Sequence, residues 1–417
     1  TTEQMEEMHD RLEALTQRVN ETVEEYGLID AYSRRASATD RFADLVRAKN
    51  SSDTATALLL LNNGYFRTWM PVLLVSIYFF LGGRSVIQGA LPLGMFLANI
   101  SVLNTIGTSC NTIAELLQDM ERAVPALERI AILLNLPDDR LLRKEASSRT
   151  RAETRKLLDG LTQVSMDDLP IRVVDVKYRY LSHHGSPLWA PINLKGVLNI
   201  HQGSLTCLIG RTGQGKSTLL KLLGGELLLQ DASISGPTSQ VFVPTHLRVA
   251  HVGDDPTFFH GSLYENLTYG VSPHAVGDGS PERAVRVCQL LGLSLDVIAF
   301  IHSQESHAWN VVLSSTDAYL LNLARALVAN PEVVCFHKPT HLFDEVRSQE
   351  ILQVLRRFVQ ESGLELEPGS GERRPRTCIF TSSRIAGVEV SDQVFHISSA
   401  HGIQLVEKNS VTPDMLH

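Results

Sequence analysis

The stretch "LTCLIGRTGQGKSTLLKLLGG", residues 205–225, places a glycine-rich turn between an apolar strand and a helix. The turn fits the pattern G-x-x-x-x-G-K-[ST] with Gly210, Gly215, Lys216 and Ser217. In such a loop the glycines let backbone N–H groups wrap around phosphates, the helix N-terminus adds its dipole, the lysine meets the β and γ phosphates, and the serine hydroxyl can bind Mg²⁺. We therefore predict a phosphate-binding loop in preference to a glycine-rich turn that binds nothing. The candidate nucleotide contacts in it are Gly210, Arg211, Thr212, Gly213, Gln214, Gly215, Lys216, Ser217 and Thr218.

The loop lies in a region with the sequence pattern of an α/β domain. From Ile171 onward, short runs of Val, Ile and Leu alternate with helical stretches. Upstream, residues 136–170 are polar, rich in Arg, Asp and Glu, and poor in periodic apolar positions. We interpret that upstream stretch as a linker.

The composition limits the function classes. With 417 residues, two or three domains are expected, and a hydrophobic share of 43% with a charged share of 20% is typical of folded chains. The net charge of -8 offers no basic footprint and disfavours a nucleic-acid partner. The cysteines lack metal-ligand spacing, so we expect reduced core residues in a cytosolic compartment. They are Cys110, Cys207, Cys288, Cys335 and Cys378.

Residues 1–50 have the pattern of a long helix that packs against another helix, because the seam positions recur at alternating spacings of four and three. An ordinary coiled-coil segment would show the same pattern. The chain begins at Thr1 in the middle of this pattern, and we expect it to be part of a longer protein. The seam positions are Met8, Leu12, Leu15, Val19, Thr22, Tyr26, Ile29 and Ser33.

Two apolar segments follow, at residues 68–82 and 86–107. A membrane-spanning helix needs about 20 mostly apolar residues, and each segment reaches that length only with its flanks. A transmembrane hairpin is favoured by Trp69 and Tyr65 near one boundary, by Arg67, which can extend to the interface, and by small residues suited to close helix packing. The alternative is a buried helical hairpin of a soluble domain.

Together these segments resemble parts of an ATP-binding cassette (ABC) exporter. Residues 171–405 resemble its nucleotide-binding domain, with 406–417 as a tail, and residues 1–135 resemble the end of its transmembrane domain. The phrase "VIQGALPLG" is similar to the outer turn between the fifth and sixth membrane helices of the family. The resemblance implies an α/β P-loop nucleotide-binding domain with an ABC helical subdomain, preceded by an all-α transmembrane segment. That segment would comprise a cytoplasmic helix at 1–55, membrane helices at about 56–83 and 85–108, and a cytoplasmic extension at 109–135.

The framework of the family's motifs is present along the cassette. Tyr180 in "VKYRY" resembles the aromatic residue that stacks on adenine, with Tyr178 at a core position, although a plain strand tyrosine would look the same. "VAHVGDDPTFFHGSLYENL" resembles the glutamine-loop segment, with Asp254 where the glutamine stands. "VVLSSTDAYLLNLARALVANPEVVCFHKPTHLFDE" resembles the signature motif, its helix and the second phosphate-binding strand. The family's aspartate after that strand is matched by Asp344.

Within that framework, the residues that would carry the family's chemistry are replaced. His337, Lys338 and Ser383 occupy the positions that resemble the family's metal-organising Asp, its catalytic Glu and its γ-phosphate-sensing His. An ammonium group with a reference pKa of about 10.4 does not accept a proton at neutral pH, and imidazole is a poor partner for Mg²⁺. In the degenerate signature, side chains replace two glycines and an aspartate adds negative charge near the phosphate. It reads Leu313, Ser314, Ser315, Thr316 and Asp317.

Two hypotheses follow. In the first, ATP binding closes the cassette and moves membrane helices for transport, with impaired hydrolysis at this site; in the second, the cassette is a pseudo-ATPase that acts as a scaffold or regulator of a partner transporter half. Lys338 could help to hold ATP, since a cation about 4 Å from a phosphate charge gains roughly 4 kcal/mol at an effective dielectric of 20, before desolvation. Mg²⁺ binding would be weak, unless Asp254 and Ser217 together supply oxygen ligands. Both hypotheses imply lipid around the helices, a cytosolic cassette, and a second cassette and transmembrane half in the same or another chain.

Overall fold

A computed structural model describes residues 2–136, 139–159, 165–180, 190–229, 239–272, 276–303, 305–366 and 373–416 of the chain. The chain divides into two compact units, Thr1–Asp138 and Asp139–His417. The boundary lies inside the predicted linker at 136–170, between the helical unit and the α/β unit.

The first unit is all helical. It consists of α1 (Thr2–Glu24), α2 (Tyr26–Ala31), α3 (Arg35–Ile87) and α4 (Leu93–Leu134). Helix α1 packs against another helix, α3, as predicted, and the Arg11 guanidinium donates a hydrogen bond to the carbonyl oxygen of Ala48 at 3.0 Å. Of the predicted seam, Leu12, Val19 and Tyr26 are exposed. The predicted single helix over residues 1–55 is divided, because the backbone turns after Ala31 and Ser33 adopts a positive φ of 53°.

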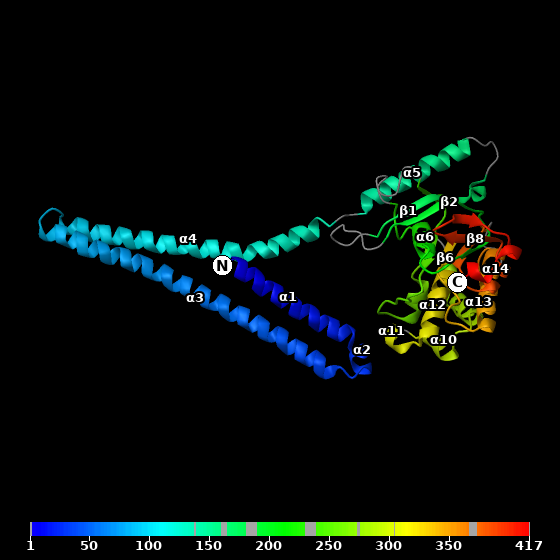
Figure 1. The fold of residues 1–417 in the computed structure, drawn as a ribbon, viewed down its shortest axis with the longest axis horizontal. Coiled ribbons are helices and arrows are strands. Elements are labelled where there is room, and N and C mark those ends of the chain that lie inside the picture. Colours follow the sequence, from blue (N-terminus) through cyan, green and yellow to red (C-terminus); the bar gives the residue numbers. More distant parts are fainter. Residues whose placement is uncertain are drawn as a thin grey trace. The chain divides into compact units, whose positions relative to one another are not determined.

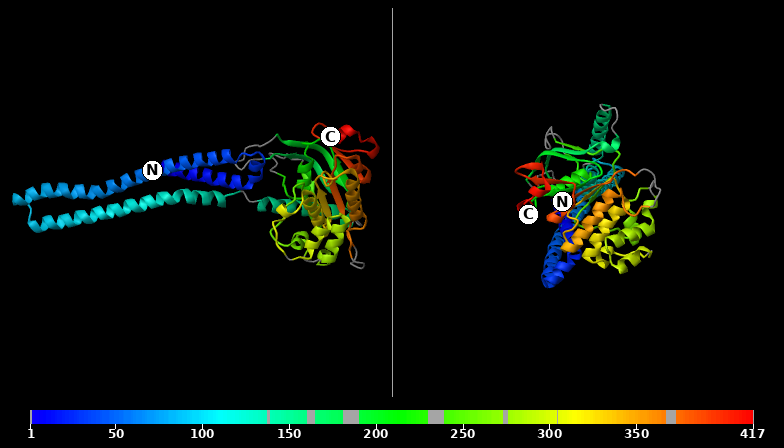
Figure 2. Two further views of the ribbon diagram at one scale, coloured as in Figure 1. Left: turned by 90° about the horizontal axis from the view of Figure 1, so that it is seen from below. Right: turned by 90° about the vertical axis from the view of Figure 1, so that its right-hand side faces the viewer.

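Helices α3 and α4 form a hairpin and run side by side in two different views (Figures 1 and 2). Their contact is close, since a Cβ added to Gly107 would lie only 2.6 Å from the Cβ of Pro71. Both helices are long and apolar enough to span a membrane, and only 6% and 11% of their apolar windows are buried. A core helix of a soluble domain would be mostly buried, so this exposure favours the transmembrane hairpin over the soluble alternative.

The predicted linker contains a helix, α5 (Arg140–Asp159), which belongs to the second unit. Arg143 donates to the carbonyl oxygen of Gly225 at 2.9 Å, and Glu153 accepts a hydrogen bond from Gln240. The sequence pattern missed this helix because polar contacts to segments more than 80 residues away hold it, rather than a periodic apolar face. Residues 137–138 and 160–164 of the predicted linker lie outside the described residues.

The second unit is built on two sheets, seen beside each other in Figure 1. One has the order β2-β1-β4 and is antiparallel, and the other has the order β5-β6-β7-β3-β8-β9, parallel except for β9. Because β5, β6, β7, β3 and β8 are parallel, their carboxyl ends meet at one edge, where α/β proteins bind ligands. The strands are β1 (Ile171–Tyr178), β2 (Ile192–Ile200), β3 (Leu205–Ile209), β4 (Gln240–Phe242), β5 (Val249–Val252), β6 (Val333–Phe336), β7 (Thr377–Thr381), β8 (Gln393–Ser398) and β9 (Gly402–Leu405).

Helices cover the larger sheet, and several of them form the helical subdomain implied by the resemblance. Strands β3, β6 and β7 are buried along their whole length, with separate apolar clusters on the two faces of the sheet. The helices of this unit after α5 are α6 (Lys216–Leu223), α8 (Leu263–Thr268), α9 (Pro281–Leu290), α10 (Leu295–Ile301), α11 (Trp309–Val312), α12 (Ser315–Ala329), α13 (Glu345–Gln360) and α14 (Ile385–Val390). Short 3-10 turns complete the unit at Met166–Asp168, Val276–Gly279, Lys408–Ser410 and Pro413–Met415.

The cysteines follow the prediction with one exception. Cys207, Cys288, Cys335 and Cys378 are free and buried in the α/β unit, and burial raises the pKa of the Cys207 thiol to about 12. Such thiols are unreactive core residues. Cys110 was also expected in the core but is exposed on α4, because it belongs to the apolar hairpin rather than to a packed interior.

Candidate nucleotide-binding site

The phosphate-binding loop leaves β3 at the carboxyl edge of the sheet and enters α6 at Lys216. Gly210 has a φ of 142°, and a Cβ there would lie 2.2 Å from the carbonyl oxygen of Ile397 on β8. Gly215, which caps α6 with a φ of 92°, would collide with the side chain of Ile192 at 2.7 Å. Only glycine fits either position, so the predicted loop has the backbone that wraps phosphate.

The Lys216 ammonium group lies over this loop. It donates to the carbonyl oxygens of Gly210 and Arg211, the latter at 2.7 Å. Burial and the nearby charge of Lys338 lower the pKa of Lys216 to about 8, which leaves it mostly protonated at neutral pH. Among the described residues no carboxylate forms an ion pair with it, so a phosphate group would be its only full counter-charge.

The rest of the loop is tied to neighbouring elements. The side-chain oxygen of Gln214 accepts a hydrogen bond from the backbone N–H of Ser399 at 2.6 Å, which fixes the loop to the turn after β8. Gly213 has a φ of 82° with open space around it, and Arg211 and Thr212 are exposed. The loop is therefore anchored at one side and open at the other, as a phosphate cradle requires.

Tyr180 lies next to the loop. Its hydroxyl group is 3.0 Å from the Thr218 hydroxyl on α6, and its ring meets that of Tyr178 edge-on at 5.1 Å between centroids. Tyr178 is buried, as predicted for a core position, while Tyr180 is half-buried. The structure thus brings the predicted adenine-stacking residue to the helix that follows the phosphate loop.

His337 follows β6 at the same sheet edge. Its Nδ1 lies 3.2 Å from the hydroxyl oxygen of Thr381, which also accepts a hydrogen bond from the backbone N–H of Lys338 at 2.7 Å. Burial lowers the pKa of His337 to about 4, against the opposing effect of Asp254, so the ring is neutral at pH 7. Its Nε2 lies 3.9 Å from the Asp254 carboxylate.

Lys338 is held by its backbone while its side chain is exposed. Its φ is 49°, and its carbonyl oxygen accepts hydrogen bonds from the Tyr319 hydroxyl at 2.7 Å and from His341 Nδ1 at 3.0 Å. Tyr319 is buried on α12, and burial raises its pKa well above the usual range, so it remains a donor. Together with the hydrogen bond from its backbone N–H to the Thr381 hydroxyl, these contacts fix the position of the Lys338 backbone.

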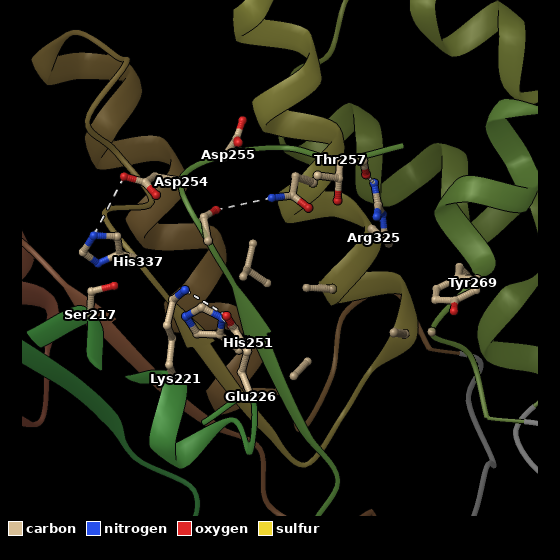
Figure 3. Close-up of a pocket in the computed structure, with 17 residues that line it drawn as sticks. Ser217, Lys221, Glu226, His251, Asp254, Asp255, Thr257, Tyr269, Arg325 and His337 are labelled. Atoms are coloured by element: carbon tan, nitrogen blue, oxygen red, sulfur yellow. Dashed lines mark hydrogen bonds and ion pairs between the residues drawn. The ribbon is translucent and has the colours of Figure 1, made fainter. Parts of the chain in front are cut away.

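Ser217, Asp254 and His337 line one pocket of about 470 Å³, shown in Figure 3. In the same pocket the Glu226 carboxylate pairs with Lys221 at 2.8 Å and with His251 at 2.9 Å. This triad was not predicted, because nothing in the local sequence marks it. Ser217 and Asp254 do share a space, but in the described parts of the chain no group of three His, Cys, Asp or Glu side chains could hold a metal ion. Ser217 and Asp254 offer oxygen ligands of the kind that Mg²⁺ takes beside phosphate and water, whereas His337 offers a nitrogen.

The degenerate signature begins α12 rather than presenting open backbone. The Ser314 hydroxyl accepts from the backbone N–H of Asp317 at 3.1 Å and donates to its carboxylate at 2.7 Å. Leu313 is half-buried, whereas Ser315 and Thr316 are exposed. Ser314 and Asp317 therefore satisfy one another as a helix cap.

Ser383 is exposed, and its neighbour Arg384 makes the contacts in this region. The Arg384 guanidinium donates to the carbonyl oxygens of Phe343 at 2.8 Å and Asp344 at 3.3 Å. The Asp344 carboxylate caps α13 by accepting from the backbone N–H of Arg347 at 2.8 Å. Sequence reasoning noted Arg384 only as the residue that follows the expected histidine.

Residues 195–341 match the family model described as ABC transporter. Among curated relatives, the mitochondrial iron-sulfur clusters transporter ABCB7 of Rattus norvegicus is 22% identical over 398 residues, which cover 92% of this chain and 47% of the relative. The alpha-hemolysin translocation ATP-binding protein HlyB of Proteus vulgaris is 26% identical over 337 residues, which cover 78% of this chain and 40% of the relative. The chain spans about half the length of the curated relatives it matches.

A solved structure described as a bacterial Atm1-family ABC exporter with ATP bound is similar to this chain with a TM-score of 0.61 at 18% identity. The similarity covers 98% of this chain and 66% of that chain. It shows that a helical segment followed by an α/β unit has the fold of an ABC exporter, as the sequence predicted.

Proposed function

We propose that the chain, which matches the ABC transporter model over residues 195–341 and shares the fold of an ABC exporter, binds ATP at residues 210–218 with impaired hydrolysis at this site. ATP binding would move the membrane helices for transmembrane transport, together with a second cassette and transmembrane half. The helices would lie in lipid and the cassette in the cytosol.

One observation carries the proposal: an intact phosphate loop faces a sheet edge without acids at the catalytic positions. Gly210 and Gly215 hold conformations that only glycine fits, and Lys216 reaches over the loop to its carbonyl groups. At the end of β6, His337 and Lys338 replace the two carboxylates of the family pattern. The parts that bind phosphate are therefore present, and the parts that activate water are replaced.

We expect the full chain, purified in detergent micelles, to bind labelled ATP, and its Lys216→Ala variant to bind at least about tenfold more weakly. The Lys216 ammonium group lies over the loop's own carbonyl groups, where a phosphate would meet it. Equilibrium dialysis with labelled ATP measures both affinities. A Lys408→Gln variant, changed far along the chain in the last residues, serves as the control with unaltered binding. Equal binding by the wild type and Lys216→Ala would contradict the proposal.

The signature favours a second candidate, a pseudo-ATPase cassette that acts as a scaffold or regulator of a partner transporter half. Ser314 and Asp317 are engaged with each other, and the side chains of Ser315 and Thr316 stand where a partner's phosphate would approach backbone. In composite sites of this family the signature serves the opposite cassette, so the partner's site would also be weakened.

Chemical labelling of Cys110 can distinguish the two candidate functions, because Cys110 is exposed on α4 while the other cysteines are buried. If ATP moves the membrane helices, the rate at which a membrane-permeant maleimide modifies Cys110 should change about twofold or more on adding ATP, and Lys216→Ala should abolish that change. A Cys110→Ala variant measures background labelling. ATP binding with an unchanged rate would favour the scaffold.

A further inference from the structure

We infer that Thr218 is a positioning residue for the base of the nucleotide, because its hydroxyl group holds the ring of Tyr180 in place before a nucleotide binds. The inference rests on the proposed ATP binding and on the predicted stacking of Tyr180 against the base. The sequence predicts Thr218 only as one residue of the phosphate loop. The structure gives its side chain a different partner.

Tyr180 and Thr218 come from different parts of the α/β unit. Tyr180 follows β1 in the antiparallel sheet, and Thr218 is the third residue of α6, the helix that the phosphate loop enters. The two residues are 38 positions apart in the chain, yet their hydroxyl oxygens are 3.0 Å apart. Because each hydroxyl group can both donate and accept, this contact is a hydrogen bond whichever of the two donates.

The packing of β1 and β2 places Tyr180 beside the loop independently of that bond. The strand register sets Tyr178 opposite Ile192, and the Ile192 side chain lies against Gly215, where an added Cβ would come within 2.7 Å of it. The Tyr180 ring meets the ring of the buried Tyr178 at 5.1 Å between centroids and packs on the apolar cluster of this face of the sheet. Tyr180 is therefore supported by the β1 core through its ring and by α6 through its hydroxyl group.

Burial divides the roles of the two residues. Thr218 is 4% exposed, whereas Tyr180 is half-buried, so Thr218 acts through Tyr180 and presents no surface of its own to a base. A side chain that binding must first order lowers the affinity by about two- to tenfold. The bond to Thr218 orders Tyr180 during folding, so the nucleotide meets an aromatic ring that is already fixed.

The test compares two ligands on the full chain in detergent micelles. One is labelled ATP, and the other is inorganic tripolyphosphate, which has phosphates but no base and is measured by its competition with labelled ATP. Tyr180→Phe and Thr218→Val each remove one hydroxyl group and keep the shape of the side chain. Each should bind ATP about three- to tenfold more weakly and bind tripolyphosphate as the wild type does, which also shows that the variant is folded.

The double variant should bind ATP no more weakly than either single variant, because both substitutions remove the same hydrogen bond. Thr218→Ser, which keeps the hydroxyl group, is the matched control and should bind both ligands as the wild type does.

An equal loss of ATP and tripolyphosphate affinity in Thr218→Val would overturn the inference, since Thr218 would then contact phosphate. Unchanged or tighter ATP binding by Tyr180→Phe would also overturn it, as would losses that add in the double variant. Each of these results leaves the proposed ATP binding in place. If neither ligand showed Lys216-dependent binding to the wild type, the proposed function would fail together with the inference, so the two failures are distinguishable.

Discussion

The full chain is expected to hydrolyse Mg-ATP no faster than its Lys216→Ala variant. General-base catalysis typically contributes about 100- to 10,000-fold, and neither residue after β6 can supply it. Lys338 is an ammonium group at neutral pH. The imidazole of His337 has a pKa lowered to about 4 by burial, and its two ring nitrogens lie against the Thr381 hydroxyl at 3.2 Å and the Asp254 carboxylate at 3.9 Å.

The measurement is steady-state phosphate release by the purified chain, with Lys216→Ala as the background. A His337→Asp, Lys338→Glu double variant restores both acids at the sheet edge. Its turnover should remain far below that of an intact cassette, since Asp317 and Ser383 still occupy positions that resemble the family's signature and its γ-phosphate-sensing His. Robust turnover of the wild type that disappears in Lys216→Ala would refute the expectation.

Replacing Arg283 by methionine should cost the α/β unit about 3 kcal/mol or more of unfolding free energy, because it leaves several buried carbonyl groups without their donor. Arg283 is 2% exposed on α9 and donates to the carbonyl oxygens of Leu364 at 2.8 Å, Val328 at 2.8 Å and Leu327 at 3.1 Å, and also to that of Asp278. Two of these carbonyl groups end α12, the helix that starts at the signature. Burial lowers the pKa of Arg283 to about 10, which still leaves it charged at neutral pH.

Arg286→Met is the matched control, three residues along the same helix. Arg286 is 44% exposed in its ion pair with Glu365, and such pairs contribute about 0–1 kcal/mol. Denaturant unfolding followed by tryptophan fluorescence compares the two variants, since Trp309 is buried in the same cluster. Equal destabilisation by both substitutions would contradict the assignment of Arg283 as a structural anchor.

Much of the fold could be predicted from the sequence, because its signals are local. The phosphate loop is specified by glycines and a lysine within a few residues, and the hairpin by two continuous apolar segments. The burial of Tyr178 and of the apolar runs at β3 and β6 follows from strand patterns of the same kind. The resemblance to the family, and not a local pattern, predicts acids at the positions of His337 and Lys338.

The rest depends on contacts between distant residues. Tyr319 reaches the carbonyl group of Lys338 across 19 positions, and Thr381 reaches its N–H across 43. Neither pairing leaves a trace in the local sequence. Helix α5 is likewise held by contacts to residues more than 80 positions away. The break before Arg35 was missed for another reason, because the three residues that redirect the chain include no glycine or proline.

The chemical state of the bound nucleotide tests most directly the claim that this cassette binds ATP without hydrolysing it. A limiting amount of ATP labelled at both the adenine and the γ-phosphate is incubated with excess full chain, and the nucleotide that stays with the protein is released and identified. The account predicts intact ATP, retained by the wild type and lost from Lys216→Ala. Bound ADP with released phosphate, formed by the wild type and absent with Lys216→Ala, would contradict it.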